Sequence, residues 1–116
     1  MRITKIIADE HGDSHFEDAE AQSLGEIIST GQVKVEASSM IFRETDHSHR
    51  QGWHCAPQKQ YVVLLDGTVE VEVSDGELRQ FKAGDIILVE DTHGSGHRTE
   101  VLSFGKRRSL FIPIPE

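Results

Sequence analysis

The chain has 116 residues, 36% of them apolar and 28% charged, with a formal net charge of −8. This length allows one hydrophobic core, so we expect a single domain spanning 1–116, and the excess of acidic residues excludes a nucleic-acid-binding surface. No run approaches the roughly 20 apolar residues of a membrane-spanning helix. Cys55 is the only cysteine. A single cysteine cannot form a disulfide within the chain, which fits a reducing compartment. The apolar stretch at the start is too short for a signal peptide, so we expect a soluble cytoplasmic protein.

The first part of the chain carries weak signals. RITKIIA, residues 2–8, predicts a leading strand. Residues 13–28 allow at most a helical turn, because their apolar residues are too sparse for an amphipathic stripe. We therefore expect a short, mostly irregular N-terminal region, followed by a strand over 33–44.

The centre of the chain predicts strands strongly. Valine and glutamate alternate over 69–73, which is typical of a strand with one buried and one solvated face. The dipeptides Asp66-Gly67 and Asp75-Gly76 separate β-rich runs, and Asp-Gly supplies the positive φ angles of tight hairpins.

Further strands are predicted over 84–91, 97–104 and 108–115. Many short strands with regular turns and almost no helix favour an antiparallel sandwich or barrel.

Two segments resemble the two sequence motifs of the cupins, a family of small barrels. They are WHCAPQKQYVVLLDGTVEVEV over 53–73 and KAGDIILVEDTHGSGHRTE over 82–100, in the family's order and with a fitting gap. The resemblance implies an all-β fold, an antiparallel jelly-roll β-barrel completed by the flanking strands.

The resemblance also implies a metal site, with two departures from the family pattern. Counting back from Gly67, the family's Glu falls on Gln60, its first His on His54 and its second His on Ala56. The His of the second motif is His97. Only two positions therefore keep the residue type that the family uses as a ligand.

The implied metal ligands are His54, Gln60 and His97, with His93 on a glycine-containing loop as a further candidate. Such nitrogen and oxygen donors suit a divalent Fe, Mn, Ni, Cu or Zn ion, and ligand type does not choose among them. Because no carboxylate is included, we expect a bound anion to compensate the metal's charge. The alternative is that these residues are hydrogen-bonded polar groups in a metal-free cavity.

The other histidines are interpreted as surface residues. His47 and His49 match His-any-His in isolation, but they lie too far upstream of the Asp66-Gly67 turn. His11 and His15 have no motif context.

Strand alternation predicts the lining of the pocket. If Gln60 points into the barrel, Val62 and Leu64 do so as well, and Thr99 follows His97. An apolar cavity with a few polar groups is the usual make-up of a small-ligand site.

Two larger side chains are further pocket candidates. Trp53 would form a wall at the mouth, or else pack in the core or an interface. Arg43 would face inward and bind an anion, or else be a rim charge. The basic cluster 106–108 is interpreted as a solvated turn, with an anion-attracting rim as the alternative.

Three functions remain open from the sequence. The first is a metal-dependent enzyme of the dioxygenase, isomerase or lyase class that acts on a small, anionic molecule. The second is a non-catalytic barrel that binds a small ligand without metal, and the third is a scaffold protein. A homodimer is expected, with strand 2–8 adding to a partner's sheet edge.

Overall fold

The computed structural model describes residues 1–46 and 50–115. His47 and His49 therefore lie outside the described residues. Within these ranges no helix is long and apolar enough to cross a membrane.

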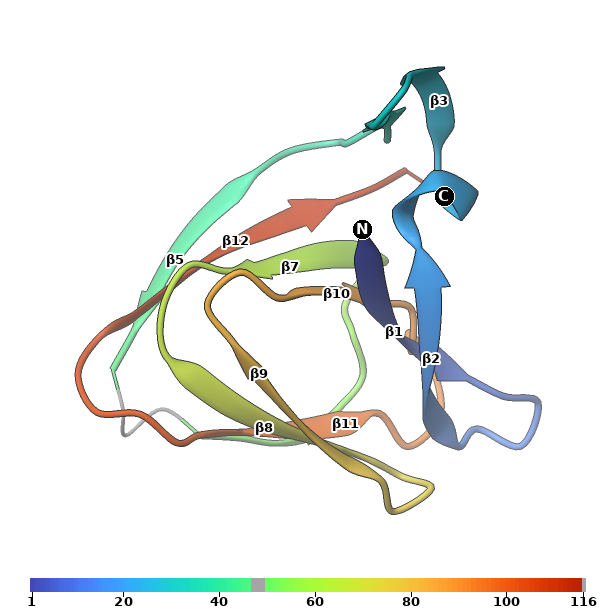
Figure 1. The fold of residues 1–116 in the computed structure, drawn as a ribbon. Coiled ribbons are helices and arrows are strands. Elements are labelled where there is room, and N and C mark those ends of the chain that lie inside the picture. Colours follow the sequence, from blue (N-terminus) through green and yellow to red (C-terminus); the bar gives the residue numbers. More distant parts are fainter. Residues whose placement is uncertain (47–49, 116) are drawn as a thin grey trace.

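Two sheets face each other and form a barrel (Figure 1). The larger sheet has the strand order β2 (Ser14–Glu20), β1 (Arg2–Ala8), β10 (Ile86–Val89), β7 (Gln60–Leu64), β12 (Arg107–Pro113) and β5 (Ile41–Thr45). The smaller has the order β6 (Arg50–His54), β11 (His97–Val101), β8 (Thr68–Val73) and β9 (Leu78–Lys82). The expected all-β jelly-roll barrel is confirmed.

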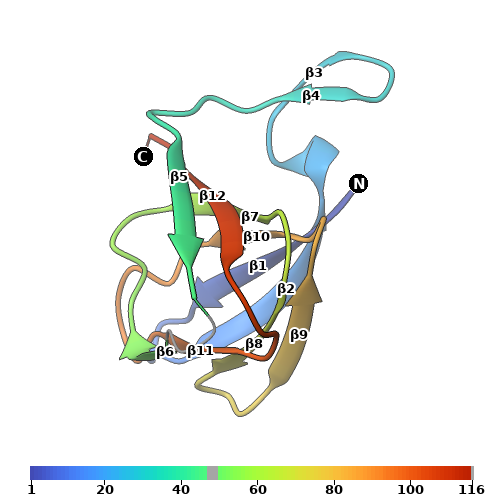
Figure 2. The ribbon, with the colours of Figure 1, turned by 90° about the vertical axis from the view of Figure 1, so that its left-hand side faces the viewer.

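One short hairpin lies apart from both sheets. It consists of β3 (Glu26–Ser29) and β4 (Gln32–Lys34), and it follows a single 3₁₀ turn, η1 (Ala21–Ser23). Figure 2 shows it projecting away from the barrel. Its strands pair with each other and with no other described strand.

The N-terminal region is regular, which corrects the expectation of a mostly irregular segment. β1 pairs with β2 along its whole length, from Arg2 opposite Glu20 to Ala8 opposite Ser14. On its other side β1 runs parallel to β10, so this pairing is an exception to the antiparallel pattern. The weak apolar signal of β2 arises because its only buried residue is Ser14 and the rest of the strand is partly or fully exposed.

This position also corrects the expected route to a homodimer. β1 is flanked by β2 and β10. Its backbone groups are therefore already paired on both sides, and residues 2–8 cannot add to a partner's sheet edge.

The two Asp-Gly dipeptides play different roles. Asp75-Gly76 closes the β8–β9 hairpin, as expected, with Gly76 at φ 98°. Asp66-Gly67 is a corner, because β7 and β8 belong to different sheets. The Asp66 carboxylate accepts hydrogen bonds from the backbone N–H and the Nε of Arg108, which fixes this corner to the start of β12.

The hydrophobic core lies between the sheets, and most of its residues also line the cavity. Val69, Val71 and Val73 of β8 are at most 3% exposed. They pack with Ile6 and Leu64 from the opposite sheet. The predicted alternation thus builds the core, and the remaining space between the sheets forms a cavity.

Candidate functional site

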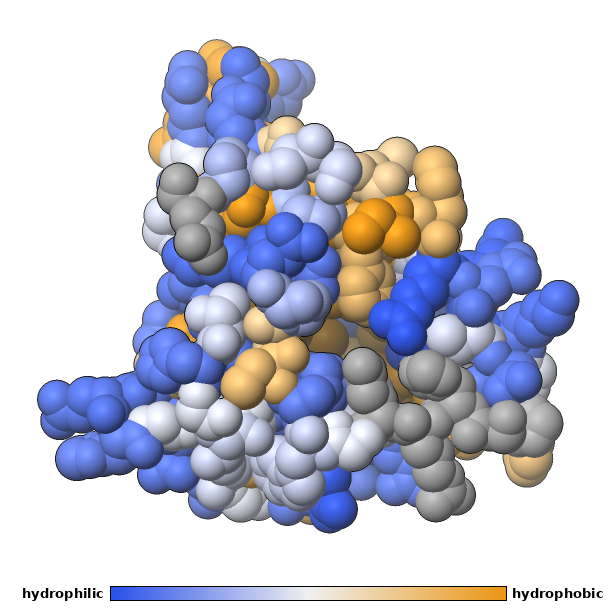
Figure 3. Space-filling model, turned by 180° about the vertical axis from the view of Figure 1, so that it is seen from behind, coloured by the Kyte–Doolittle hydropathy of each residue, from blue (hydrophilic) through white to orange (hydrophobic). Residues whose placement is uncertain are grey.

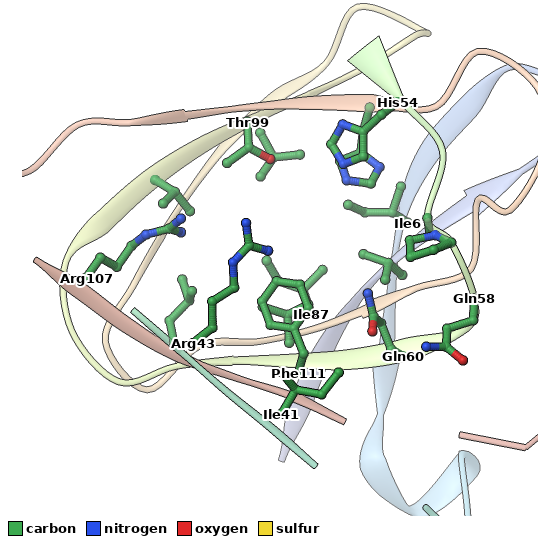
Figure 4. Close-up of a pocket in the computed structure, with 18 of the residues that line it drawn as sticks. Ile6, Ile41, Arg43, His54, Gln58, Gln60, Ile87, Thr99, Arg107 and Phe111 are labelled. Carbon is green, nitrogen blue, oxygen red and sulfur yellow. The ribbon is translucent and has the colours of Figure 1, made fainter. Parts of the chain in front are cut away.

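The barrel encloses a cavity of about 310 Å³ between the two sheets. Most of its lining is apolar and includes Val62 and Leu64 of β7. Its polar and charged lining residues are Arg43, His54, Gln58, Gln60, His97, Thr99 and Arg107. Figure 4 shows Arg43 and Arg107 entering from one side, and His54 and Gln60 from the other.

His54 and His97 are brought together by the pairing of β6 with β11. They are direct partners in the antiparallel register, and their ring centroids lie 4.6 Å apart. Gly96 permits this approach, because a Cβ there would lie 2.1 Å from the backbone oxygen of His54. Its φ of 74° is also a conformation that favours glycine.

Each imidazole is oriented through its Nδ1. The His54 Nδ1–H donates to the backbone oxygen of Gly52 at 2.7 Å, since a carbonyl can only accept. In His97, Nδ1 lies 2.6 Å from Oδ2 of Asp91. With Nδ1 used in this way, Nε2 is the ring nitrogen that remains for other partners, which is the usual arrangement of a metal-binding or proton-accepting histidine.

Asp91 is the main functional candidate that the sequence analysis missed. It is fully buried, and its Oδ1 has no hydrogen-bond partner among the described groups. Its backbone oxygen accepts the N–H of Ala56, which ties the end of β10 to the segment after β6. The only sequence signal was the position of Asp91, an acidic residue directly after a buried strand. That position does not indicate which side chain Asp91 contacts.

The donor set matches a divalent metal only in part. His54 and His97 present two imidazole nitrogens, and Gln60, which is 5% exposed, adds an amide group to the same cavity. Among the described residues no cluster of three or more His, Cys, Asp or Glu side chains lies close enough to hold a metal ion. A metal held by these residues would need further ligands from solution, so the donor set fits a divalent metal only weakly.

The opposite side of the cavity carries two guanidinium groups. Arg43 on β5 pairs in register with Ser109, two residues along β12 from Arg107. The two arginines are therefore diagonal neighbours on the inner face of one strand pair. The guanidinium of Arg43 also lies 4.9 Å from the centre of the Phe111 ring.

Arg107 does not belong to a solvated turn. It is only 9% exposed and lines the cavity, whereas Lys106 and Arg108 beside it are exposed. Its Nη2 donates to Thr45 Oγ1 at 3.2 Å, but its buried Nε has no partner among the described groups. Burial lowers the pKa of Arg107, and the nearby positive charge of Arg43 lowers it further.

Two predicted pocket residues lie elsewhere. Trp53 is 47% exposed, and its ring lies against the guanidinium of Arg98 on the outer face of β11. His93 is exposed in the loop before β11 and does not line the cavity. Trp53 misses the cavity because it neighbours His54 on β6, and adjacent residues of a strand point to opposite faces. His93 misses it because it lies in the loop between β10 and β11.

His15 is more than a surface residue. Its ring lies between two carboxylates, with Nε2 2.6 Å from Asp9 and Nδ1 2.9 Å from Asp75. The contact joins the loop after β1 to the β8–β9 turn. These hydrogen bonds, to Asp9 first and then Asp75, raise the pKa of His15.

Comparisons with known proteins show the fold. No family model and no curated protein matches the chain. An RmlC-like cupin family protein with a double-stranded β-helix fold from Methanocaldococcus jannaschii has a TM-score of 0.54 at 8% identity, over 99% of this chain and 81% of that one. A protein from Neisseria meningitidis has a TM-score of 0.50 at 19% identity, over 85% and 100%. The chain is thus a small barrel with the cupin fold.

Proposed function

We propose that this chain, a barrel with the cupin double-stranded β-helix fold, binds a small organic anion in its cavity. One observation carries the proposal. The protein has a net charge of −8, yet its cavity lining, among the described residues, contains two arginines and two histidines and no acidic side chain. A positive cavity inside an acidic protein selects negative ligands.

The arginine pair is the anchor. Guanidinium groups bind carboxylates through paired, charge-assisted hydrogen bonds. The buried Nε of Arg107 is a donor with no described protein acceptor, and leaving such a donor unpaired costs free energy. A bound carboxylate supplies the acceptor and offsets the repulsion between Arg43 and Arg107.

The imidazoles face the other end of the ligand. An anion held by the arginines extends across the apolar middle of the cavity toward His54 and His97. His97 Nε2 then accepts a proton from a carbon or oxygen beside a carbonyl group, and Asp91 stabilises the resulting imidazolium. The Gln60 amide donates to the oxygen on which negative charge develops. This is chemistry of the isomerase or lyase class.

Calorimetric titration with acetate, pyruvate, malonate, benzoate and inorganic phosphate tests the binding step. Each lost charge-assisted hydrogen bond costs about 1.5–3 kcal/mol, so Arg43→Gln and Arg107→Gln should weaken the best ligand about tenfold or more. Arg98→Gln is the matched control, because Arg98 is an exposed arginine on the outer face of β11. Equal affinities in all three variants would reject the proposal.

Solvent-deuterium exchange separates an enzyme from a binding module. If His97 exchanges protons with the bound acid, deuterium enters the position next to its carbonyl, and His97→Gln abolishes the incorporation while binding persists. A ligand that binds but never exchanges favours the second candidate, a non-catalytic barrel.

The single cysteine fits a reducing compartment. We therefore include a cytoplasmic location in the proposal.

A divalent metal is a second candidate component, an alternative to proton transfer by His97, because a metal-bound Nε2 cannot also accept a proton. It is favoured by the two Nε2 atoms in one cavity. His54 and His97 would hold it with the Gln60 oxygen, and it would supply Lewis-acid polarisation of a carbonyl. Because the protein ligands are uncharged, Zn²⁺ affinity should be weak alone and should rise when the best carboxylate is present. Equal Zn²⁺ affinity with and without the carboxylate, or no loss of affinity in His54→Ala, would contradict this.

A further inference from the structure

Ser14 is a fully buried polar residue that the proposed function does not use. It is the first residue of β2, directly after the turn of residues 9–13 that joins β1 to β2, and its exposed fraction is 0%. The turn projects beside β2 in Figure 1, and seen from behind in Figure 3 this part of the surface is hydrophilic. A hydroxyl group buried this deeply needs hydrogen-bond partners, because burial without them costs free energy.

The Ser14 hydroxyl both accepts and donates a hydrogen bond. Its Oγ accepts the backbone N–H of Ser74 at 2.8 Å, and it donates to the backbone oxygen of Gly96 at 2.7 Å. An N–H can only donate and a carbonyl oxygen can only accept, so the direction of each hydrogen bond is fixed. The hydroxyl proton of Ser14 therefore points at Gly96.

The hydrogen bond from Ser14 to Gly96 acts on His97 through one peptide group. The carbonyl of Gly96 and the backbone nitrogen of His97 belong to the same planar unit. A hydrogen bond to that carbonyl therefore fixes the orientation of the plane from which His97 departs. Gly96 also packs against the backbone oxygen of His54, so its position affects how closely the two imidazoles approach.

A second contact ties the loop before β11, residues 92–96, to the β1–β2 turn. The N–H of Ser95 donates to the backbone oxygen of Gly12 at 2.8 Å. Gly94 lies so close to the same residue that a Cβ on Gly94 would be 2.2 Å from the Gly12 oxygen. The loop that leads to His97 is thus in direct backbone contact with the turn that leads to Ser14.

Ser14 is itself anchored on the β8–β9 turn. Its N–H donates to Ser74 Oγ at 2.7 Å, and its backbone oxygen accepts the N–H of Asp75 at 3.3 Å. The next residue, His15, adds to this anchor because its ring bridges Asp9 and Asp75. These contacts fix Ser14 in place, so that Ser14 can in turn fix the peptide group of Gly96.

We propose that Ser14 is a positioning residue for His97. Through the Gly96 carbonyl it keeps the His97 ring in contact with Asp91 and facing the cavity. His97 is thereby held at its side chain by Asp91 and at its backbone by Ser14. The part of His97 in a reaction rests on the proposed function, whereas its positioning by Ser14 does not.

NMR spectra of the ¹⁵N-labelled chain without ligand test the proposal. In Ser14→Ala the Gly96 carbonyl loses its donor, so the Nδ1 signals of His97 should shift. The nuclear Overhauser contact between the rings of His54 and His97, whose centres are 4.6 Å apart, should weaken. Ser14→Cys keeps the buried position filled with a weaker donor, so it should change the same signals in the same direction by a smaller amount.

Ser74→Ala is the matched control. It removes the acceptor of the Ser14 N–H but leaves the contact of the Ser14 hydroxyl with Gly96. This variant should lower the stability of the chain without moving the His97 signals. Unchanged His97 signals in Ser14→Ala, or changes of equal or greater size in Ser74→Ala, would overturn the proposal.

Deuterium exchange into pyruvate gives the functional measurement. Misplacement of a reacting group by about 1 Å costs up to about 100-fold in rate, so the exchange rate should fall about tenfold or more in Ser14→Ala. The affinity for pyruvate should change less than about twofold, because the arginines that bind the carboxylate are intact. Exchange at the unmodified rate in Ser14→Ala would contradict the proposal. If the unmodified chain exchanges none of the tested acids, the proposed reaction is wrong instead, and the spectra without ligand decide the positioning role.

Discussion

Oδ2 of Asp91 lies 2.6 Å from Nδ1 of His97, and both residues are buried. The contact joins the segment after β10 to the first residue of β11. It places a carboxylate directly behind an imidazole that faces the cavity. Asp91 does not line the cavity itself, so it can affect a bound ligand only by orienting His97.

Asp91→Asn should change the tautomer of His97. The carboxylate can only accept a hydrogen bond, which keeps the proton on Nδ1, whereas an amide can also donate and so permits the proton on Nε2. The ¹⁵N chemical shifts of the ring should report an Nδ1–H form in the unmodified chain and a mixture in the variant. Asp85→Asn, in the turn before β10, is the control. Identical His97 spectra in all three proteins would show that Asp91 has no positioning role.

Arg107→Met should stabilise the protein while it weakens anion binding. The substitution removes a buried guanidinium with an unpaired Nε and removes its repulsion with Arg43. Leaving a buried donor unsatisfied costs about 1–3 kcal/mol, so we expect the free energy of unfolding to rise by about 1 kcal/mol. Urea unfolding measures this. Arg108→Met, at an exposed position, should not raise stability, and a less stable Arg107→Met would refute the prediction.

Gly96→Ala should destabilise the chain more than Gly76→Ala. Both glycines have positive φ, which costs an alanine about 1–2 kcal/mol. A Cβ at residue 96 also meets the His54 backbone at 2.1 Å, whereas a Cβ at residue 76 meets nothing within 4 Å. We expect about 2–5 kcal/mol for Gly96→Ala by thermal or urea unfolding, including the overpacking cost, and about 1 kcal/mol for the control. Equal losses of stability in the two variants would mean that the backbones of Gly96 and His54 do not pack closely.

The His15 contact should stabilise the fold most in mildly acidic solution. Its pKa is raised in the folded chain, so its contribution is fully present below the unfolded value of about 6.5 and is lost as pH rises through the folded pKa. The pKa of Asp9 is lowered, mainly by the same hydrogen bond, so its contribution is lost only at pH values below about 4.

Unfolding curves of His15→Gln check this. The stability difference from the unmodified chain should be larger near about pH 6 than near about pH 8.5. His11→Gln, at an exposed histidine in the loop between β1 and β2, is the control. A difference that is constant or grows with pH would contradict the assignment.

Much of the barrel could be predicted because its signals are local. Alternation along β7 and β11 indicated that Gln60 and His97 share a face with Val62 and Thr99, and all four line the cavity. The N-terminal strands were harder to predict, because only one residue of β2 is buried and the strand lacks the apolar alternation that marks a half-buried strand.

For the central strands, the sequence by itself determined which side chains share a face, since neighbouring residues of a strand must point to opposite sides. The tertiary structure alone decided which inward groups meet. Arg107 joins Arg43 through the β12–β5 register, and Asp91 reaches His97 because a loop returns beside β6. These contacts depend on pairing between segments that are far apart in the chain. Local residue patterns do not indicate which distant segments pair.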